Sequence, residues 1–129
     1  PPDYLGFDDA IYAAARLLKI VAATTQPVSE MLADLPRYVS TPEIRADCGE
    51  DRKVPVVQAA ASYFAGKYET ITIDGVRWRT PEGWGLIRAS NTQPILVMRF
   101  EARTADALAQ IRDEALRVLA DAGVHIEAT

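Results

Sequence analysis

The sequence has 129 residues, a length that suits one compact domain and is short for two. Hydrophobic residues make up 49% and charged residues 25%, so we expect a folded chain and not a disordered one. The single cysteine, Cys48, excludes a disulfide framework and a cysteine zinc site, and the single histidine, His125, excludes a pair of histidine metal ligands. No apolar run approaches the roughly 18 residues of a membrane-spanning helix. We expect a cytoplasmic protein in which Cys48 is a free thiol.

The net charge of −4 is unevenly distributed. Residues 76–103 carry five arginines against two glutamates, whereas the sequence on both sides is acidic. Arginine has a planar fork of donors that suits phosphate and carboxylate groups. The basic stretch therefore favours an anion-binding region, although chance clustering on a solvated sheet face is an open alternative.

The first 35 residues favour helices without strands. Asp8 is expected to cap a helix over residues 8–24, in which apolar residues recur every three or four positions. A short second helix, capped by Ser29, is expected to end before Pro36. Because the chain begins with Pro1-Pro2 and no Met, we interpret residues 1–35 as the helical tail of a preceding domain plus a hinge linker. Without that domain, the apolar stripe would favour self-association.

Residues 36–129 favour a domain of mixed strands and helices. Residues 37–46 are expected to be extended, with Pro42 at an edge or a bulge, and Asp51 is expected to cap a helix ending at Ala65. Alternating patterns and turn signals then predict a strand meander, a helix capped by Thr104 and a short last strand. The predicted segments are Thr70–Ile73, Val76–Arg79, Trp84–Arg88, Ile95–Phe100, the helix from 104 to 123, and Val124–Ile126. The predicted fold class is α+β, with a mostly antiparallel four- to five-stranded sheet and helices packed on one face.

The loop between the last two long strands of the meander has the chemistry of a phosphate site. Arg88 would supply positive charge and paired donors, Ser90 and Thr92 hydroxyl groups, and Asn91 an amide. No carboxylate interrupts residues 88–94, which fits an anion ligand. An ordinary hairpin loop is the alternative, because serine, asparagine, threonine and proline are common turn residues.

The order of these residues resembles a known motif. Arg88-Ala89-Ser90-Asn91-Thr92-Gln93-Pro94, with the strand after it, is similar to the phosphate-binding loop of the α-D-phosphohexomutase family, and in particular of bacterial phosphomannomutase/phosphoglucomutase enzymes. Further collinear segments resemble the same enzymes and extend the resemblance over nearly the whole chain. They are Gly6-Phe7-Asp8-Asp9-Ala10 with the helix after it, Tyr38-Val39-Ser40-Thr41-Pro42-Glu43-Ile44-Arg45, Asp74-Gly75-Val76, and Gly83-Trp84-Gly85.

The resemblance implies that the chain is the fourth domain of such an enzyme, with a TATA-binding-protein-like fold, plus the end of the third. In this family the fourth domain grips the phosphate of the hexose phosphate that is not transferred, so Arg88, Ser90, Asn91 and Thr92 are implied as its ligands. Arg99 is a weaker candidate. The reacting serine and the Mg²⁺ site lie in other domains of the family, so we expect no catalytic residue, no metal site and no mutase activity here. The implied ligand is a mannose or glucose 1- or 6-phosphate, and the implied partner is the rest of the enzyme.

Two other functions stay open on the sequence. A sheet with arginines in its middle would suit a nucleic-acid-binding module, although the aromatic residues of the strands, Trp78, Trp84 and Phe100, are few and scattered. A stand-alone protein-interaction domain without a small ligand is the other alternative.

Overall fold

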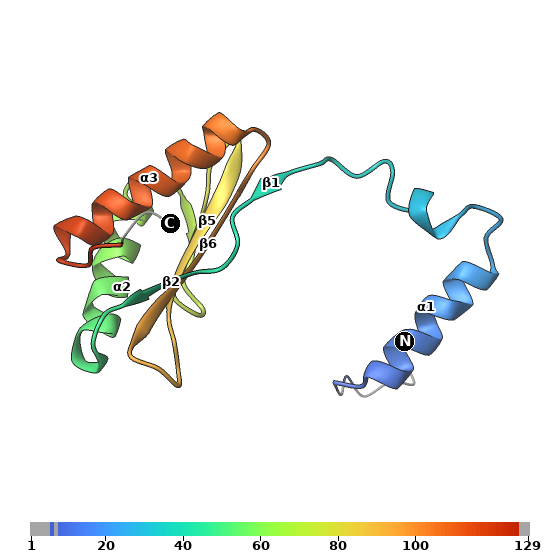
Figure 1. Cartoon of the computed structure of the whole chain (residues 1–129), viewed down its shortest axis with the longest axis horizontal. Coiled ribbons are helices and arrows are strands. Elements are labelled where there is room, and N and C mark those ends of the chain that lie inside the picture. Colours follow the sequence, from blue (N-terminus) through green and yellow to red (C-terminus); the bar gives the residue numbers. More distant parts are fainter. Residues whose placement is uncertain (1–5, 7, 127–129) are drawn as a thin grey trace. The chain divides into compact units, whose positions relative to one another are not determined.

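The computed structural model describes residue 6 and residues 8–126, and it divides into two compact units at the boundary between Pro36 and Arg37 (Figure 1). The outermost parts of the predicted segments 1–35 and 36–129 lie outside the described residues. The first unit holds helix α1 (Ala10–Ala22) and the 3₁₀ turn η1 (Val28–Glu30). The second holds β1 (Val39–Ser40), β2 (Ile44–Asp47), α2 (Glu50–Ala65), β3 (Glu69–Ile71), β4 (Val76–Arg79), β5 (Gly83–Ala89), β6 (Ile95–Ala102) and α3 (Ala105–Asp121). None of the helices in the described part of the chain has the length and apolar character needed to cross a membrane.

Helix α1 begins one residue later than the sequence predicts. Asp9, and not Asp8, caps it, because Asp9 has extended backbone angles and its carboxylate accepts a hydrogen bond from the Tyr12 N–H at 2.9 Å. The predicted second helix is only the single turn η1, in which Ser29 is an internal residue and not a cap. Within its own unit, α1 has no buried residue.

The sheet is antiparallel throughout, as the strand patterns predict. Its strands run in the order β1-β6-β5-β4-β3, and β2 also pairs with β6, so that β1 and β2 share one neighbour. Pro42 lies in the gap between β1 and β2, which confirms the predicted edge position of this residue. With α2 and α3 packed against the sheet, the predicted α+β class is confirmed (Figure 1).

The core lies between the sheet and the helices α2 and α3. Alternate strand residues face the helices, and the largest of those that are fully buried are Trp78 on β4, Ile87 on β5, and Leu96, Met98 and Phe100 on β6. The Trp78 ring stacks on the Phe64 ring of α2 with 3.7 Å between centroids and 6° between planes. The side chains that alternate with these point to the opposite, open face of the sheet, and they include the arginines of β4, β5 and β6.

The ends of α2 and α3 decide three predictions about the second unit: the caps of both helices and the last strand. Thr104 caps α3 as predicted, since its hydroxyl accepts a hydrogen bond from the Ala107 N–H at 3.2 Å. Helix α2 instead starts at Glu50 after Gly49, whose φ of 69° favours glycine, so the prediction of Asp51 as its cap is wrong. The predicted last strand over residues 124–126 is also wrong, because the Val124 N–H is taken by the Leu119 carbonyl at the end of α3.

A buried carboxylate ties α3 to the end of α2. Glu114 accepts hydrogen bonds from the hydroxyl groups of Tyr63 at 3.0 Å and Tyr68 at 2.9 Å, and from the Lys67 ammonium. Burial by itself disfavours the charged form of Glu114, but the hydrogen bonds from Lys67, Tyr68 and Tyr63 outweigh it and lower the pKa of this carboxyl. The charged form is thus stabilised in the folded state.

Because of this carboxylate, the free energy of unfolding of the domain should decrease at acidic pH. The pKa of Glu114 is lower in the folded state than in the unfolded state, where it is about 4.3. The carboxylate therefore contributes its full stabilisation of the fold above the unfolded pKa, and this stabilisation is lost as the pH falls through the folded pKa. We expect Glu114→Gln to cost about 1–3 kcal/mol at pH 7, and the difference from the wild type to shrink by pH 3. Urea denaturation at both pH values measures this difference, and a difference that does not change with pH would contradict the assignment.

Candidate functional site: the loop between β5 and β6

The loop of residues 90–94 joins the two longest strands and is anchored at both ends. The Ser90 N–H donates to the Ile95 carbonyl at 3.0 Å, which closes the hairpin. The Cys48 N–H donates to the Pro94 carbonyl at 3.0 Å, which ties the loop to the chain just after β2. The backbone therefore holds the loop where the two neighbouring strands β5 and β6 meet, as the sequence predicts.

Arg88 lies on β5 next to the loop, opposite Val97 of β6. Its neighbour Ile87 is buried under the helices, so Arg88 belongs to the open face of the sheet. The side chain of Arg88 is 33% exposed, and Nη1 lies 3.8 Å from Oδ2 of Asp74. An ion pair with this separation and this exposure to solvent contributes little binding energy. The guanidinium is therefore able to exchange Asp74 for an anionic ligand.

Ser90 shapes the loop from inside. It is 9% exposed, and its Oγ accepts hydrogen bonds from the backbone N–H groups of Thr92 at 3.4 Å and Gln93 at 3.3 Å. The hydroxyl hydrogen is still available to a ligand, because Oγ acts only as acceptor in these bonds. The side chains of Asn91 and Thr92 are exposed at the tip. Three of the four predicted ligand residues thus lie in one short turn, and Arg88 lies directly before it.

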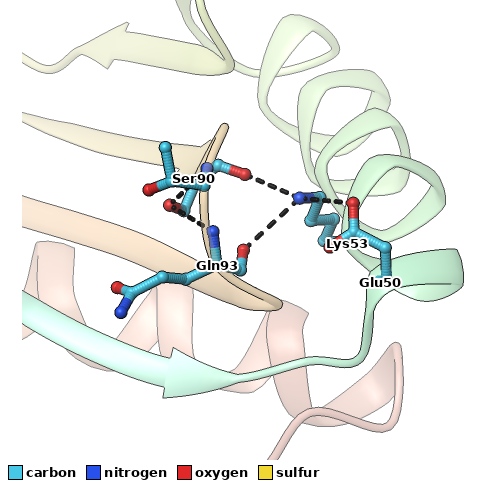
Figure 2. Close-up of polar contacts among 5 residues, drawn as sticks. Glu50, Lys53, Ser90 and Gln93 are labelled. Carbon is cyan, nitrogen blue, oxygen red and sulfur yellow. Dashed lines mark hydrogen bonds and ion pairs between the residues drawn. The ribbon is translucent and has the colours of Figure 1, made fainter.

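Lys53 is a residue of this site that the sequence reasoning missed. It lies on α2, is only 6% exposed, and its ammonium donates to the carbonyls of Ser90 at 2.7 Å and Gln93 at 3.3 Å (Figure 2). Glu50 accepts from the same ammonium at 2.7 Å. A signal was present in the sequence, because Lys53 occupies the same helical stripe as the apolar Val57. A charge on the buried side of a helix requires a partner.

The open face around the loop carries arginines, with Asp47 of β2 among them. The register places Arg45 of β2, Val97 and Arg88 side by side, and it places Arg99 opposite Leu86 in the next row. Arg99 is exposed, and among the described residues no carboxylate forms an ion pair with it. Arg45 is already paired with Glu43 at 2.8 Å, which leaves Arg88 and Arg99 as the cations available to an anion in this part of the face. The ligand role of Arg99 itself stays a prediction.

The aromatic residues of the strands do not form a stacking platform. Trp78 and Phe100 are fully buried under the helices, so of the three strand aromatics only Trp84 lies on the open face. The Trp84 ring is already covered by the Arg77 guanidinium, at 4.6 Å from the ring centroid. The alternative of a nucleic-acid-binding module therefore finds little support.

The described residues offer no cluster of metal ligands. Across residue 6 and residues 8–126, no three side chains of the histidine, cysteine, aspartate or glutamate type gather closely enough to hold a metal ion. The donors of the loop are cationic or neutral, which suits an anion and not Mg²⁺. No step through a metal ion is therefore assigned to this chain.

The comparisons with known proteins agree with the fold. Residues 43–118, more than half of the chain, match the family model described as phosphoglucomutase/phosphomannomutase, C-terminal domain. A phosphoglucomutase of Neisseria meningitidis is 48% identical over 114 residues, which cover 86% of this chain and 25% of that protein. A phosphomannomutase/phosphoglucomutase of Pseudomonas aeruginosa is 44% identical over 110 residues, covering 84% of this chain and 24% of that protein.

A solved structure gives the same result in three dimensions. A phosphoglucomutase/phosphomannomutase family protein from Burkholderia thailandensis superposes with a TM-score of 0.78 at 42% identity, over 93% of this chain and 25% of that one. The chain thus spans about a quarter of the length of the relatives it matches. It belongs to the phosphoglucomutase/phosphomannomutase family, of which it contains the C-terminal domain.

Proposed function

We propose that this chain serves a phosphohexomutase by gripping the phosphate of the hexose phosphate that is not being transferred. The observation that carries the proposal is the loop after Arg88, in which the donors of Ser90, Asn91 and Thr92 gather in one turn beside a weakly paired arginine. A phosphate monoester has nearly two negative charges and three acceptor oxygens, and this set of donors complements both.

Each donor would have a distinct part in binding. Arg88 would give up its long contact with Asp74 and form charge-assisted hydrogen bonds to the phosphate. Ser90 would donate its hydroxyl hydrogen while its oxygen continues to hold the turn. Asn91 and Thr92, exposed at the tip, would reach the remaining oxygens. Binding energy gained at this phosphate would position the sugar and the distant phosphate that reacts.

The proposed division of labour places the chemistry in other domains. Residues 1–35 would be the helical tail of the third domain and a hinge linker, and residues 36–129 the phosphate-binding domain. The serine that carries the phosphoryl group and the Mg²⁺ site would lie in the rest of the enzyme. The 129-residue chain would therefore bind a hexose phosphate and would not isomerise it.

A titration of the 129-residue chain tests both halves of the proposal. We expect glucose 1-phosphate to shift the amide resonances of residues 88–92 in ¹H–¹⁵N spectra, with a Kd on the order of 1 mM because a single phosphate is held. Glucose, which lacks the phosphate, is the matched control and should shift none of them. A coupled assay should detect no mutase activity. Absent shifts would overturn the phosphate role, and measurable turnover would overturn the division of labour.

A further inference from the structure

The strongest unassigned feature of the chain is the buried ammonium of Lys53 behind the loop. We propose that Lys53 is a positioning residue that turns the Ser90–Asn91 peptide so that the Asn91 N–H faces the bound phosphate. This inference rests on the proposed function of the loop. Lys53 would act through the loop backbone and would not itself contact the ligand.

The contact with Lys53 fixes the direction of the Ser90–Asn91 peptide group. The Lys53 ammonium lies on α2, and the Ser90 carbonyl points at it with 2.7 Å between nitrogen and oxygen. No cis peptide bond occurs in the described residues, so the N–H of Asn91 points opposite to the Ser90 carbonyl. The Asn91 N–H therefore points away from α2. Within residues 8–126, no protein group accepts a hydrogen bond from it.

The same ammonium also holds the far end of the turn. Its second acceptor is the Gln93 carbonyl at 3.3 Å, and the next residue, Pro94, has no N–H to present. Figure 2 shows the ammonium between α2 and the loop, joined to both carbonyls and to Glu50. One charged group thus fixes both corners of a four-residue turn. The Ser90 hydroxyl fixes its middle.

Because Lys53 is buried, its ammonium needs these contacts to remain charged inside the domain. The ammonium of a side chain that is only 8% exposed must be compensated by acceptors, and Glu50 and the two loop carbonyls supply them. A loop that is already ordered loses less conformational entropy when a phosphate binds. Removing the ammonium should therefore weaken phosphate binding as well as loosen the loop.

Lys53→Met in the 129-residue chain tests the inference, with glucose 1-phosphate as ligand. We expect this variant to bind about tenfold more weakly than the wild type. We also expect its Thr92 and Gln93 amides to exchange with deuterium faster, while β6 stays protected. Lys67→Met is the matched control, because it removes the same charge near the other end of α2, where Lys67 pairs with Glu114 and not with the loop. It should retain wild-type affinity.

A measurement on the wild type keeps the inference testable if Lys53→Met does not fold. On addition of glucose 1-phosphate, the Asn91 amide proton of the wild type should show the largest downfield shift of the loop. Wild-type binding without a downfield shift of Asn91, or equal affinity in Lys53→Met, would overturn the role of Lys53 alone. Absence of any binding by the wild type would instead overturn the phosphate function, and the role of Lys53 with it.

Discussion

Arg88→Ala in the full-length enzyme is expected to lower kcat/KM by about one to two orders of magnitude. A hydrogen bond to a charged group contributes about 1.5–3 kcal/mol, and each 1.4 kcal/mol corresponds to a factor of ten. The weak contact between Arg88 and Asp74 in the free domain means that little protein stability is lost with the guanidinium. The loss should therefore appear in kinetics and not in the melting temperature.

Two further variants make the result specific to the loop. Arg88→Lys keeps the charge and loses the fork of donors, so its kcat/KM should lie between those of the wild type and Arg88→Ala. Arg112→Ala removes the same charge from α3, where Arg112 pairs with Asp113 on the helical side of the domain. It should leave kcat/KM unchanged. Steady-state kinetics with wild-type kcat/KM for Arg88→Ala would remove Arg88 from the phosphate site.

The strand patterns predict most of this domain because side chains alternate between two very different faces. Val76 and Trp78 face the helices, whereas Arg77 and Arg79 face away, and this period of two is visible in the sequence. The helix ends are harder to predict, because neighbouring residues compete for the same role. Asp8 and Asp9 are both good caps, and only the backbone angles of Asp9 decide between them.

The candidate site shows the same division between local and distant information. The turn from Arg88 to Pro94 is contiguous, so its donors are visible in the sequence. Lys53 lies 37 residues before Ser90, and its contact with the loop depends on how α2 packs over the sheet. The predicted strand near Val124 fails for a related reason. Val124 is buried, but the end of α3 takes its backbone donor, so burial there does not require a strand.

Gly85→Ala is expected to destabilise the domain by about 2–4 kcal/mol, the upper part of the range for forcing volume into a packed core. Gly85 pairs with Trp78 of β4 and Phe100 of β6, and a Cβ at this position would lie 2.2 Å from Cζ2 of the Trp78 ring. The ring has no room to move away, because it is fully buried and stacked on Phe64. At about 4–8 °C per kcal/mol for a domain of this size, the melting temperature should fall by at least about 8 °C.

Gly66→Ala provides the matched control for the added methyl group. The Cβ at position 66 would meet its nearest atom, the Tyr63 carbonyl oxygen, at 3.4 Å, and the φ of −73° suits alanine. Its melting temperature should not fall below that of the wild type, since replacing glycine by alanine at a compatible site stabilises a protein by about 0.4–1 kcal/mol. Thermal unfolding followed by circular dichroism measures both variants. Equal melting temperatures for Gly85→Ala and Gly66→Ala would mean that the Trp78 ring shifts to accommodate the methyl group at little cost. The close packing of Trp78 against Gly85 would then not be what holds the ring in place.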